Sequence, residues 1–523
     1  MTSTLPAAPA ETDPADVPEL VAAAVVAGQR WAATSRTERA AVLDAVADAL
    51  DAAGDDLVPL AVADSHLGEV RLRGELLRTT FQLRLFGEVL REGGYLDVRV
   101  DHADPDWPMG APRPDLRRTM VPLGPVVVFA AGNFPFAFSV AGGDTASALA
   151  AGCPVLLKAH PGHLPLSVAT ADVVRAALAA AGAPDDLLTL VVGDEAGRAA
   201  LTDPGVAACG FTGSTAGGRA LFDLAVSRPV PIPFFGELGS VNPVFVTEAA
   251  ARARGAEIAE QAVSSFTMGA GQFCTKPGVL VVPAGSPLLD ALGAADLPAP
   301  APMLSDRMVS GHNRVRHELE DVAGVEVLAR GEDGEDGTPA PTVLRTDVAT
   351  LLVDLESLFR ECFGPTLLVA TYSGEADLLA LAQVIDGQLT ASVFGEPDDV
   401  PRLTDLVATL ATKAGRVLWN AWPTGVSVTY AQQHGGPYPA TTAASTTSVG
   451  TAAISRFVRP VAFQGFPDAL LPPELTEEGG LPQRVDGVLE VRPATGSAPG
   501  SDQTGRPGEA SGSGDATGSG AEA

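Results

Sequence analysis

From Pro125 onward, short segments that are apolar throughout alternate with alanine-rich segments. The apolar runs read P-V-V-V-F-A-A, P-V-L-L-K-A, L-L-T-L-V-V-G and V-A-A-C-G-F-T. Helices are predicted between them, among others near residues 165–182 and 195–201. Strands that are apolar on both faces are typical of a parallel sheet covered by helices on both sides. The sequence therefore predicts a doubly wound α/β domain.

A second α/β set follows, with strands predicted in V-N-P-V-F-V, G-V-L-V-V-P, T-L-L-V-A-T and A-S-V-F-G. Two such domains are expected to meet at a cleft that holds a ligand. Ahead of them, residues 19–53 have helical spacing, with Thr37 as the expected N-cap. Residues 331–341 are predicted to form a solvated loop. The Gly-, Ser- and Ala-rich tail, residues 493–523, is predicted to be disordered.

Composition excludes several classes of protein. The 523-residue chain has a formal net charge of -30, and no run of Lys and Arg forms a basic face for nucleic acid or an anionic membrane. The most apolar stretch, Val121 to Gly143, is interrupted by two prolines and an asparagine, which disfavours a membrane span. Four widely spaced cysteines indicate neither a zinc site nor a disulfide framework. Without a recognisable signal peptide, we expect a cytoplasmic protein.

The segment F-T-G-S-T-A-G-G, residues 211–218, leaves an apolar strand and enters a helix. Backbone amides at a glycine-rich helix N-terminus suit a pyrophosphate, although such turns are also purely structural. Lys158 ends the preceding strand P-V-L-L-K, at the sheet edge where ligands of such folds lie. It either contacts a ribose or phosphate or is a solvated strand-end lysine.

Glu237 in F-F-G-E-L-G and Cys274 in G-A-G-Q-F-C-T lie in small-residue loops, as a base and a nucleophile for carbonyl chemistry would. The other cysteines lie beside apolar segments, where free cysteines are usually inert. Asn133 in G-N-F-P either donates to an oxyanion or only forms a turn.

Taken together and in order, six motifs resemble those of the aldehyde dehydrogenase superfamily over roughly residues 20–465. They are G-N-F-P, F-T-G-S, F-G-E-L-G, G-Q-F-C, E-C-F-G-P and R-V-L-W-N. The segments H-G-G-P-Y-P-A-T and T-S-V-G-T-A-A-I-S-R-F-V-R-P further resemble an NADP-dependent branch. That branch includes 2-oxoglutarate semialdehyde (2,5-dioxopentanoate) dehydrogenases and a long-chain aldehyde dehydrogenase.

The resemblance implies roles for individual residues. Cys274 would be the nucleophile, Glu237 the general base, and Asn133 with the Cys274 N–H the oxyanion hole. The cofactor would be bound by Lys158, Gly213, Ser214, Glu361, Phe363 and Arg198.

It also implies a domain plan and an oligomer. The dinucleotide-binding domain would span residues 15–108 and 125–239, and the catalytic domain residues 240–432. Strands in residues 109–124 and 448–466 would join copies of the chain into a homodimer or homotetramer.

The expected reaction is oxidation of an aldehyde to a carboxylic acid through a thiohemiacetal and a thioester. NADP is the expected cofactor, with NAD possible, because Pro161 stands where NAD-preferring relatives carry a glutamate. Arg198 or His160 would meet the 2'-phosphate. His434 is either an active-site residue of the branch or a loop histidine that supports a turn.

The expected substrate is 2-oxoglutarate semialdehyde, which needs a cation such as Arg117, Arg118 or Arg456 near the pocket. The alternative is a long-chain or general aliphatic aldehyde, and Phe136, Trp419, Trp422 and Val426 could line either pocket. A CoA-acylating relative would lack Glu237. A non-catalytic protein of the same fold would be expected to lack the nucleophile, the base or the oxyanion donor.

Overall fold

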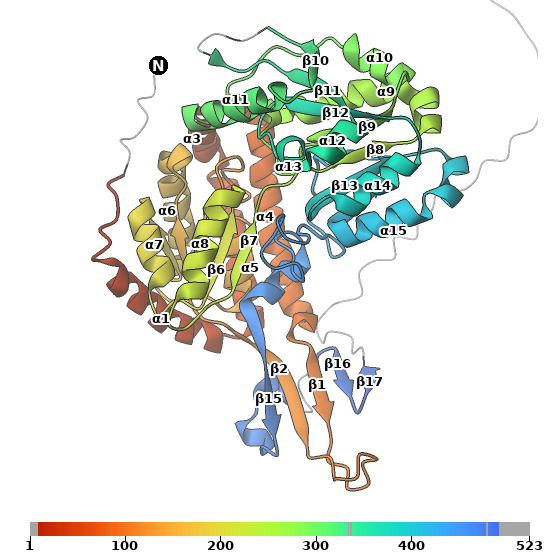
Figure 1. Cartoon of the computed structure of the whole chain (residues 1–523). Helices are drawn as coiled ribbons and strands as arrows, with labels where there is room; N and C mark the ends of the chain where they lie inside the picture. Colours follow the sequence, from red (N-terminus) through yellow and green to blue (C-terminus); the bar gives the residue numbers. More distant parts are fainter. Residues whose placement is uncertain (1–8, 333, 335–336, 477–479, 491–523) are drawn as a thin grey trace, which may run out of the picture.

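The computed structural model describes residues 9–332, 334, 337–476 and 480–490, and these residues form three β-sheets (Figure 1). The tail predicted over residues 493–523 lies outside the described residues. Part of the loop predicted over residues 331–341 lies outside them as well. Among the described residues, no helix is both long and apolar enough to cross a membrane.

The first sheet is parallel throughout, in the order β5-β4-β3-β6-β7. Its strands are β3 (Val126–Phe129), β4 (Val155–Lys158), β5 (Leu188–Val191), β6 (Ala208–Thr212) and β7 (Phe234–Glu237). Four helices connect or follow them: α5 (Gly143–Ala151), α6 (Leu164–Ala180), α7 (Asp194–Thr202) and α8 (Thr215–Ser227). A short 3-10 turn, η2 (Pro161–His163), follows β4.

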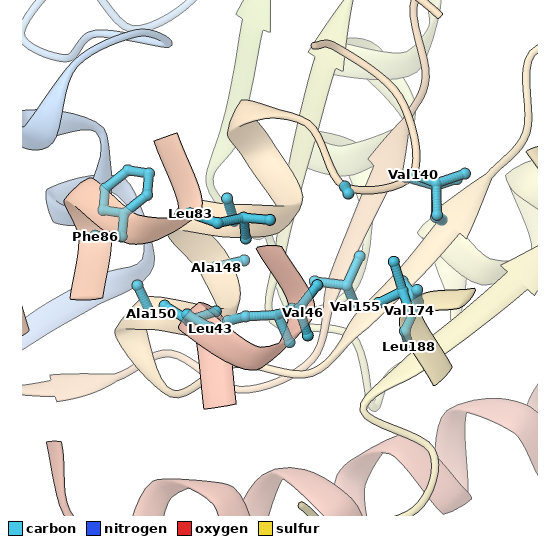
Figure 2. Close-up of a cluster of buried hydrophobic side chains, with 14 of the residues drawn as sticks. Leu43, Val46, Leu83, Phe86, Val140, Ala148, Ala150, Val155, Val174 and Leu188 are labelled. Atoms are coloured by element: carbon cyan, nitrogen blue, oxygen red, sulfur yellow. The ribbon is translucent and has the colours of Figure 1, made fainter. Parts of the chain in front are cut away.

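Both faces of this sheet are covered. In β3, Val126 and Val128 pack into one core with α2, α4 and α6, whereas Val127 and Phe129 pack into another with α1, α7 and α8. Figure 2 shows part of the first core, where Leu43 and Val46 of α2 meet Val155 of β4. The N-terminal helices are α1 (Val17–Ala33), α2 (Arg36–Ala52), α3 (Gly54–Ser65) and α4 (Glu69–Glu92), followed by η1 (Gly94–Leu96). The predicted doubly wound α/β fold is confirmed.

The N-cap of α2 is Ser35, so the expectation of Thr37 was wrong. The Ser35 hydroxyl accepts from the Glu38 N–H, and the Glu38 carboxylate accepts from the Ser35 N–H at 3.1 Å. This reciprocal capping box satisfies two amides that the helix itself leaves unpaired, which a cap at Thr37 would not do.

The second sheet has the order β10-β11-β12-β9-β8-β13-β14 and is parallel except for its first pair. Its strands are β8 (Val244–Val246), β9 (Val279–Pro283), β10 (Glu326–Arg330), β11 (Thr342–Asp347), β12 (Thr366–Tyr372), β13 (Gln388–Phe394) and β14 (Ala414–Trp419). Its helices are α9 (Glu248–Thr267), η3 (Met268–Gly271), α10 (Pro287–Gly293), α11 (Asp306–Glu320), α12 (Val348–Val353), α13 (Leu355–Leu358), α14 (Ala376–Val384), η5 (Pro397–Arg402) and α15 (Thr404–Lys413). Again two apolar cores lie on opposite faces.

The third sheet forms an arm that projects away from the other two (Figure 1). Its order is β15-β2-β1-β16-β17, with β1 (Val98–Asp101), β2 (Leu116–Pro122), β15 (Val458–Gln464), β16 (Gln483–Val485) and β17 (Val488–Glu490). Along the chain, the turn η6 (Thr451–Phe457) precedes β15, and the turns η7 (Asp468–Leu470) and η8 (Pro473–Leu475) follow it. β2 and β15 fall in the segments predicted to join copies of the chain, and β15 is an edge strand.

Candidate active site

Cys274, Glu237 and His434 converge from three parts of the chain. Glu237 ends β7, Cys274 lies between η3 and β9, and His434 lies in the loop after β14. One ligand atom from each of the three lies within 4.8 Å of the others. His434 Nε2 is 2.8 Å from Glu237 Oε1 and 3.6 Å from Cys274 Sγ. The base and the thiol singled out in the sequence therefore meet, and the histidine joins them.

The loop that presents Cys274 has an unusual backbone. Gly269, Ala270 and Gly271 all have positive φ, and a Cβ on Gly271 would overlap the backbone of Gly364. Positive φ is unfavourable for a residue such as Ala270, so the surrounding structure must hold the loop in place. Asn242 does so, because its Nδ2 donates to the carbonyl oxygens of Cys274 at 2.8 Å and Lys276 at 2.9 Å.

Burial and charge shift the pKa values of the central pair in opposite directions. Burial raises the pKa of Cys274 well above its usual value, and the neighbouring Glu237 carboxylate raises it further. Burial also acts to raise the pKa of Glu237. Attraction to His434 and hydrogen bonds from His434, Ser448 and Cys274 outweigh burial, so the pKa of Glu237 lies below its usual value. The free enzyme thus holds a protonated thiol beside an ionised carboxylate that can take its proton.

A small cavity borders Glu237 on the side of Ser448. It has a volume of about 10 Å³ and is also lined by His434 and Arg456. Ser448 Oγ donates to Glu237 Oε2 at 2.6 Å, which fixes the carboxylate at the cavity wall. The volume is close to the minimum needed for one water molecule.

Asn133 lies beside the nucleophile loop. Its side-chain Nδ2 donates to the Gln272 carbonyl at 2.9 Å, and its own backbone carbonyl accepts from Arg71 at 2.8 Å. An amide NH2 carries two protons, so one N–H is left beyond the bond to Gln272. The predicted oxyanion donor therefore lies against Gln272, which is two residues before Cys274 in the loop.

Charged residues gather around the carboxyl end of β4. Lys158 Nζ contacts Asp194 Oδ1 at 2.6 Å, and Arg198 and Arg307 both lie close enough to lower the pKa of Asp194. His160 lies beside this cluster. Burial, followed by the neighbouring His163 and Lys158, lowers the pKa of His160 to about 3, so it is neutral near pH 7.

The predicted pyrophosphate residues lie at the start of α8, and the predicted nicotinamide residues follow α13. Ser214 is exposed and caps α8 through the Gly217 N–H, and Gly213 precedes it. Beyond α8, a Cβ on Gly239 would lie 2.5 Å from Glu361 Oε2, so a larger residue there would displace that carboxylate. Burial raises the pKa of Glu361 to about 7, and Phe363 two residues on is half-buried.

These residues fit a dinucleotide. A cationic cluster, the N-terminus of α8 and a carboxylate whose charge acts on the pKa of the Cys274 thiol are groups that can bind a ribose phosphate, a pyrophosphate and a second ribose.

Several residues considered for the substrate pocket lie elsewhere. Arg117 and Arg118 are in β2 of the arm, where they pair with Asp115, Asp468 and Asp97. Arg456 pairs with Asp144 at 2.7 Å behind Glu237. The aromatic candidates also have other surroundings. Phe136 is buried in the first core, Trp419 is exposed, and Trp422 packs on Phe394. Of that set, Val426 packs near Phe138, beside the active site.

Sequence reasoning missed three groups of this site. Ser448, Asn242 and Arg78 of α4 contact or lie near the central residues. Ser448 and Arg78 are far from Glu237 and Cys274 in the sequence, whereas Asn242 is close to Glu237. Asn242 follows the F-G-E-L-G motif directly and has positive φ, which a turn-forming asparagine tolerates. The position of Asn242 in a turn after this motif was the signal that could have identified it. No comparable signal marked the arginines of α4, because helical spacing does not show which end of a long side chain is buried.

Comparison with known proteins defines the class. The sequence profile of the aldehyde dehydrogenase family matches residues 2–292. The chain is 41% identical over 482 residues to an alpha-ketoglutaric semialdehyde dehydrogenase of Acinetobacter baylyi, covering 91% of each chain. It is 44% identical over 463 residues to alpha-ketoglutaric semialdehyde dehydrogenase 2 of Azospirillum brasilense, covering 86% of this chain and 87% of that one. The chain belongs to the aldehyde dehydrogenase family and is an enzyme that oxidises aldehydes.

Solved structures share the fold. Lactaldehyde dehydrogenase of Escherichia coli aligns with a TM-score of 0.74 at 19% identity, covering 87% of this chain and 92% of that one. Aldehyde dehydrogenase C of Pseudomonas syringae, solved with NAD+ and octanal, aligns with a TM-score of 0.72 at 21% identity, covering 88% and 91%. A nicotinamide dinucleotide therefore fits both the family and the residues around the site.

Proposed function

We propose that this enzyme oxidises 2-oxoglutarate semialdehyde to 2-oxoglutarate with NADP, by covalent catalysis at Cys274. The observation that carries the chemistry is the convergence of Cys274, Glu237 and His434 within 4.8 Å. The substrate assignment is supported by the names of the two relatives that are 41% and 44% identical over about nine-tenths of the chain.

In the first step, Cys274 Sγ attacks the aldehyde carbon while its proton passes to Glu237, to which the thiol is hydrogen-bonded. The Sγ–C bond forms and the carbonyl becomes an oxyanion. The remaining N–H of Asn133 and the Cys274 backbone N–H stabilise that oxyanion, a contribution of about 3 kcal/mol per donor in comparable sites. His434 keeps Glu237 oriented and ionised between turnovers.

The cofactor would lie along the groups already described. Lys158 would bind the adenine-side ribose, Gly213 and Ser214 the pyrophosphate, and Glu361 the nicotinamide-side ribose, with Phe363 packing near the ring. When bound, the nicotinamide supplies the hydride acceptor that converts the thiohemiacetal to a thioester.

Before the last step, Glu237 releases to solvent the proton that it took from the thiol. It then accepts a proton from water, whose oxygen attacks the thioester carbon, and returns that proton to the departing Cys274 sulfur. The C–S bond breaks, the carboxylic acid leaves and Cys274 is regenerated. Cys274 does not line the cavity of about 10 Å³ beside Glu237 and Ser448, so the attacking water would enter from the thiol side of the carboxylate. The lowered pKa of Glu237 keeps the base ionised in the free enzyme.

The preference for NADP rests on the charges around β4. Three cations, Lys158, Arg198 and Arg307, surround a single acid, Asp194. Pro161 follows in place of a second carboxylate that would repel a 2'-phosphate. We therefore assign the 2'-phosphate to Arg198, with Arg307 from α11 beside it.

A second candidate substrate is a general or long-chain aliphatic aldehyde. An apolar cluster of Leu85, Val428 and Val449 packs against Phe138 and Val426 next to the active site, which favours an aliphatic chain. A charged semialdehyde would instead need a cation in the pocket.

An aldehyde panel tests the proposal. Purified enzyme is assayed with 2-oxoglutarate semialdehyde, succinate semialdehyde, pentanal and decanal, each with NADP and with NAD. We expect the highest kcat/KM for 2-oxoglutarate semialdehyde with NADP. A higher kcat/KM for decanal would assign the enzyme to aliphatic aldehydes, and a higher value with NAD would overturn the cofactor assignment.

We also propose a cytoplasmic homodimer or homotetramer assembled through the arm. β15 is an edge strand with unpaired backbone groups along one side, a natural site for pairing with a second copy. Light scattering of the purified protein tests this, and a monomer at micromolar concentration would contradict it.

A further inference from the structure

Arg78 of α4 is a half-buried cation whose two terminal nitrogens have no hydrogen-bond partner among the described residues. Both of its terminal nitrogens, Nη1 and Nη2, are shielded from solvent, and neither has a partner among the described residues. A guanidinium carries five N–H donors, and leaving them unpaired inside a protein is costly. Such a group is retained at that cost when a ligand of opposite charge completes it.

The surroundings of Arg78 place it at the active site. Its guanidinium lies over the Phe138 ring, 5.4 Å from the centroid, and that ring is 6.5 Å from the ring of His434. The charges of Cys274 and Glu237 are close enough to act on the pKa of Arg78, although burial dominates and lowers it. Through the Phe138 ring, Arg78 therefore lies near His434 and the residues around Cys274.

Glu75, one turn earlier on α4, does not neutralise Arg78 by a direct ion pair. Its Oε1 accepts from the backbone N–H groups of Phe136 and Ala137 at 2.8 and 3.0 Å, so it is committed to the loop that follows Asn133. The charge of Glu75 nevertheless acts on Arg78, since after burial it is the largest influence on the pKa of that guanidinium and raises it.

Two other arginines near the site are already engaged. Arg71 donates to the Asn133 carbonyl and lies against the rings of Phe134 and Phe273. Arg416 donates through both Nη atoms, to the carbonyls of Gly425 and Pro423. Of these three arginines, Arg78 alone has both terminal nitrogens available.

We propose that Arg78 binds the carboxylate of the substrate and thereby selects oxo-acid semialdehydes over neutral aldehydes. This inference rests on the proposed function and names the residue that would supply its specificity. The planar guanidinium matches a carboxylate through two parallel hydrogen bonds, which an ammonium cannot reproduce. The Phe138 ring beneath it restricts the guanidinium to one orientation.

The test compares two five-carbon aldehydes, 2-oxoglutarate semialdehyde and pentanal, with Arg78→Met and Arg78→Lys. Arg78→Met should lower kcat/KM for the semialdehyde by about 100-fold, mainly by raising KM. The same substitution should change kcat/KM for pentanal by less than about threefold. Arg78→Lys should recover part of the loss. The matched control is Arg84→Met on the same helix, whose side chain pairs with Asp48 and Asp51 at the surface, and both activities should stay unchanged.

An equal loss for both aldehydes, or no loss for either, would overturn the role of Arg78. Failure of the proposed function is distinguishable, because the wild-type enzyme would then prefer pentanal before any substitution is made. If Arg78→Met does not fold, inhibition by 2-oxoglutarate with pentanal as substrate decides the question. Wild type should be inhibited competitively and Arg78→Lys at least tenfold more weakly, whereas equal inhibition of the two would refute the inference.

Discussion

The two ends of the proposed cofactor path differ in how their charges are held. At the Cys274 end, Glu237 and His434 are almost fully buried and bonded to each other. At the β4 end, Lys158 is largely buried, but Asp194 and Arg198 are exposed. Water screens charges at the second end and hardly at the first. Substitutions at the buried end should therefore have large effects on chemistry, and those at the exposed end small, salt-dependent effects on binding.

The largest effect is expected for Cys274→Ala. Without the thiol no covalent intermediate forms, so kcat should fall by at least about a thousandfold. NADP binding, followed by the quenching of protein fluorescence, should be retained because the ribose and phosphate contacts lie elsewhere. Cys209→Ala, which removes a buried thiol of β6, is the control and should keep its turnover. Residual dehydrogenase activity in Cys274→Ala would exclude the covalent route.

A smaller, pH-dependent effect is expected for Ser448→Ala. The Ser448 hydroxyl helps to lower the pKa of Glu237, so its removal raises that pKa. A base with a raised pKa is protonated up to a higher pH, and the acid limb of kcat should therefore move toward neutral pH. We expect a loss of about tenfold on the acid side, shrinking as pH rises. Ser455→Ala, an exposed position whose hydroxyl bonds to Ala452, should leave the profile in place. A loss that is uniform across pH would argue for a purely structural Ser448.

The smallest effect is expected at the exposed end. Arg198→Ala and Arg307→Ala should each raise KM for NADP by about three- to tenfold, and the effect should fade as salt is added. KM for NAD should not change, since NAD lacks the 2'-phosphate. Arg314, on the same helix as Arg307, forms an ion pair with Glu318, and Arg314→Ala serves as the control. Equal changes for both cofactors would remove these arginines from the phosphate site.

Much of the fold could be predicted from the sequence because its signals are local. Apolar runs such as P-V-L-L-K became strands buried on both faces, since each residue had to pack against a helix layer. The cap of α2 was misplaced by two residues, because Ser35 and Thr37 both carry a hydroxyl and only the reciprocal bond to Glu38 separates them. Within the arm, β16 and β17 were not predicted, since pairing of strands distant in sequence leaves little local signal.

For the active site, the sequence determined which chemical groups are present: one thiol in a small-residue loop, one acid after an apolar strand, and one histidine of undecided role. Only the tertiary structure decided that these three share one buried pocket, with Ser448 and Asn242 holding them. The proposed substrate cation also changes from Arg117, Arg118 or Arg456 to Arg78, whose pKa is influenced by the charge of Cys274. The physical reason is that residue type and spacing fix what a segment can do, whereas burial and charge pairing depend on neighbours that are hundreds of residues away.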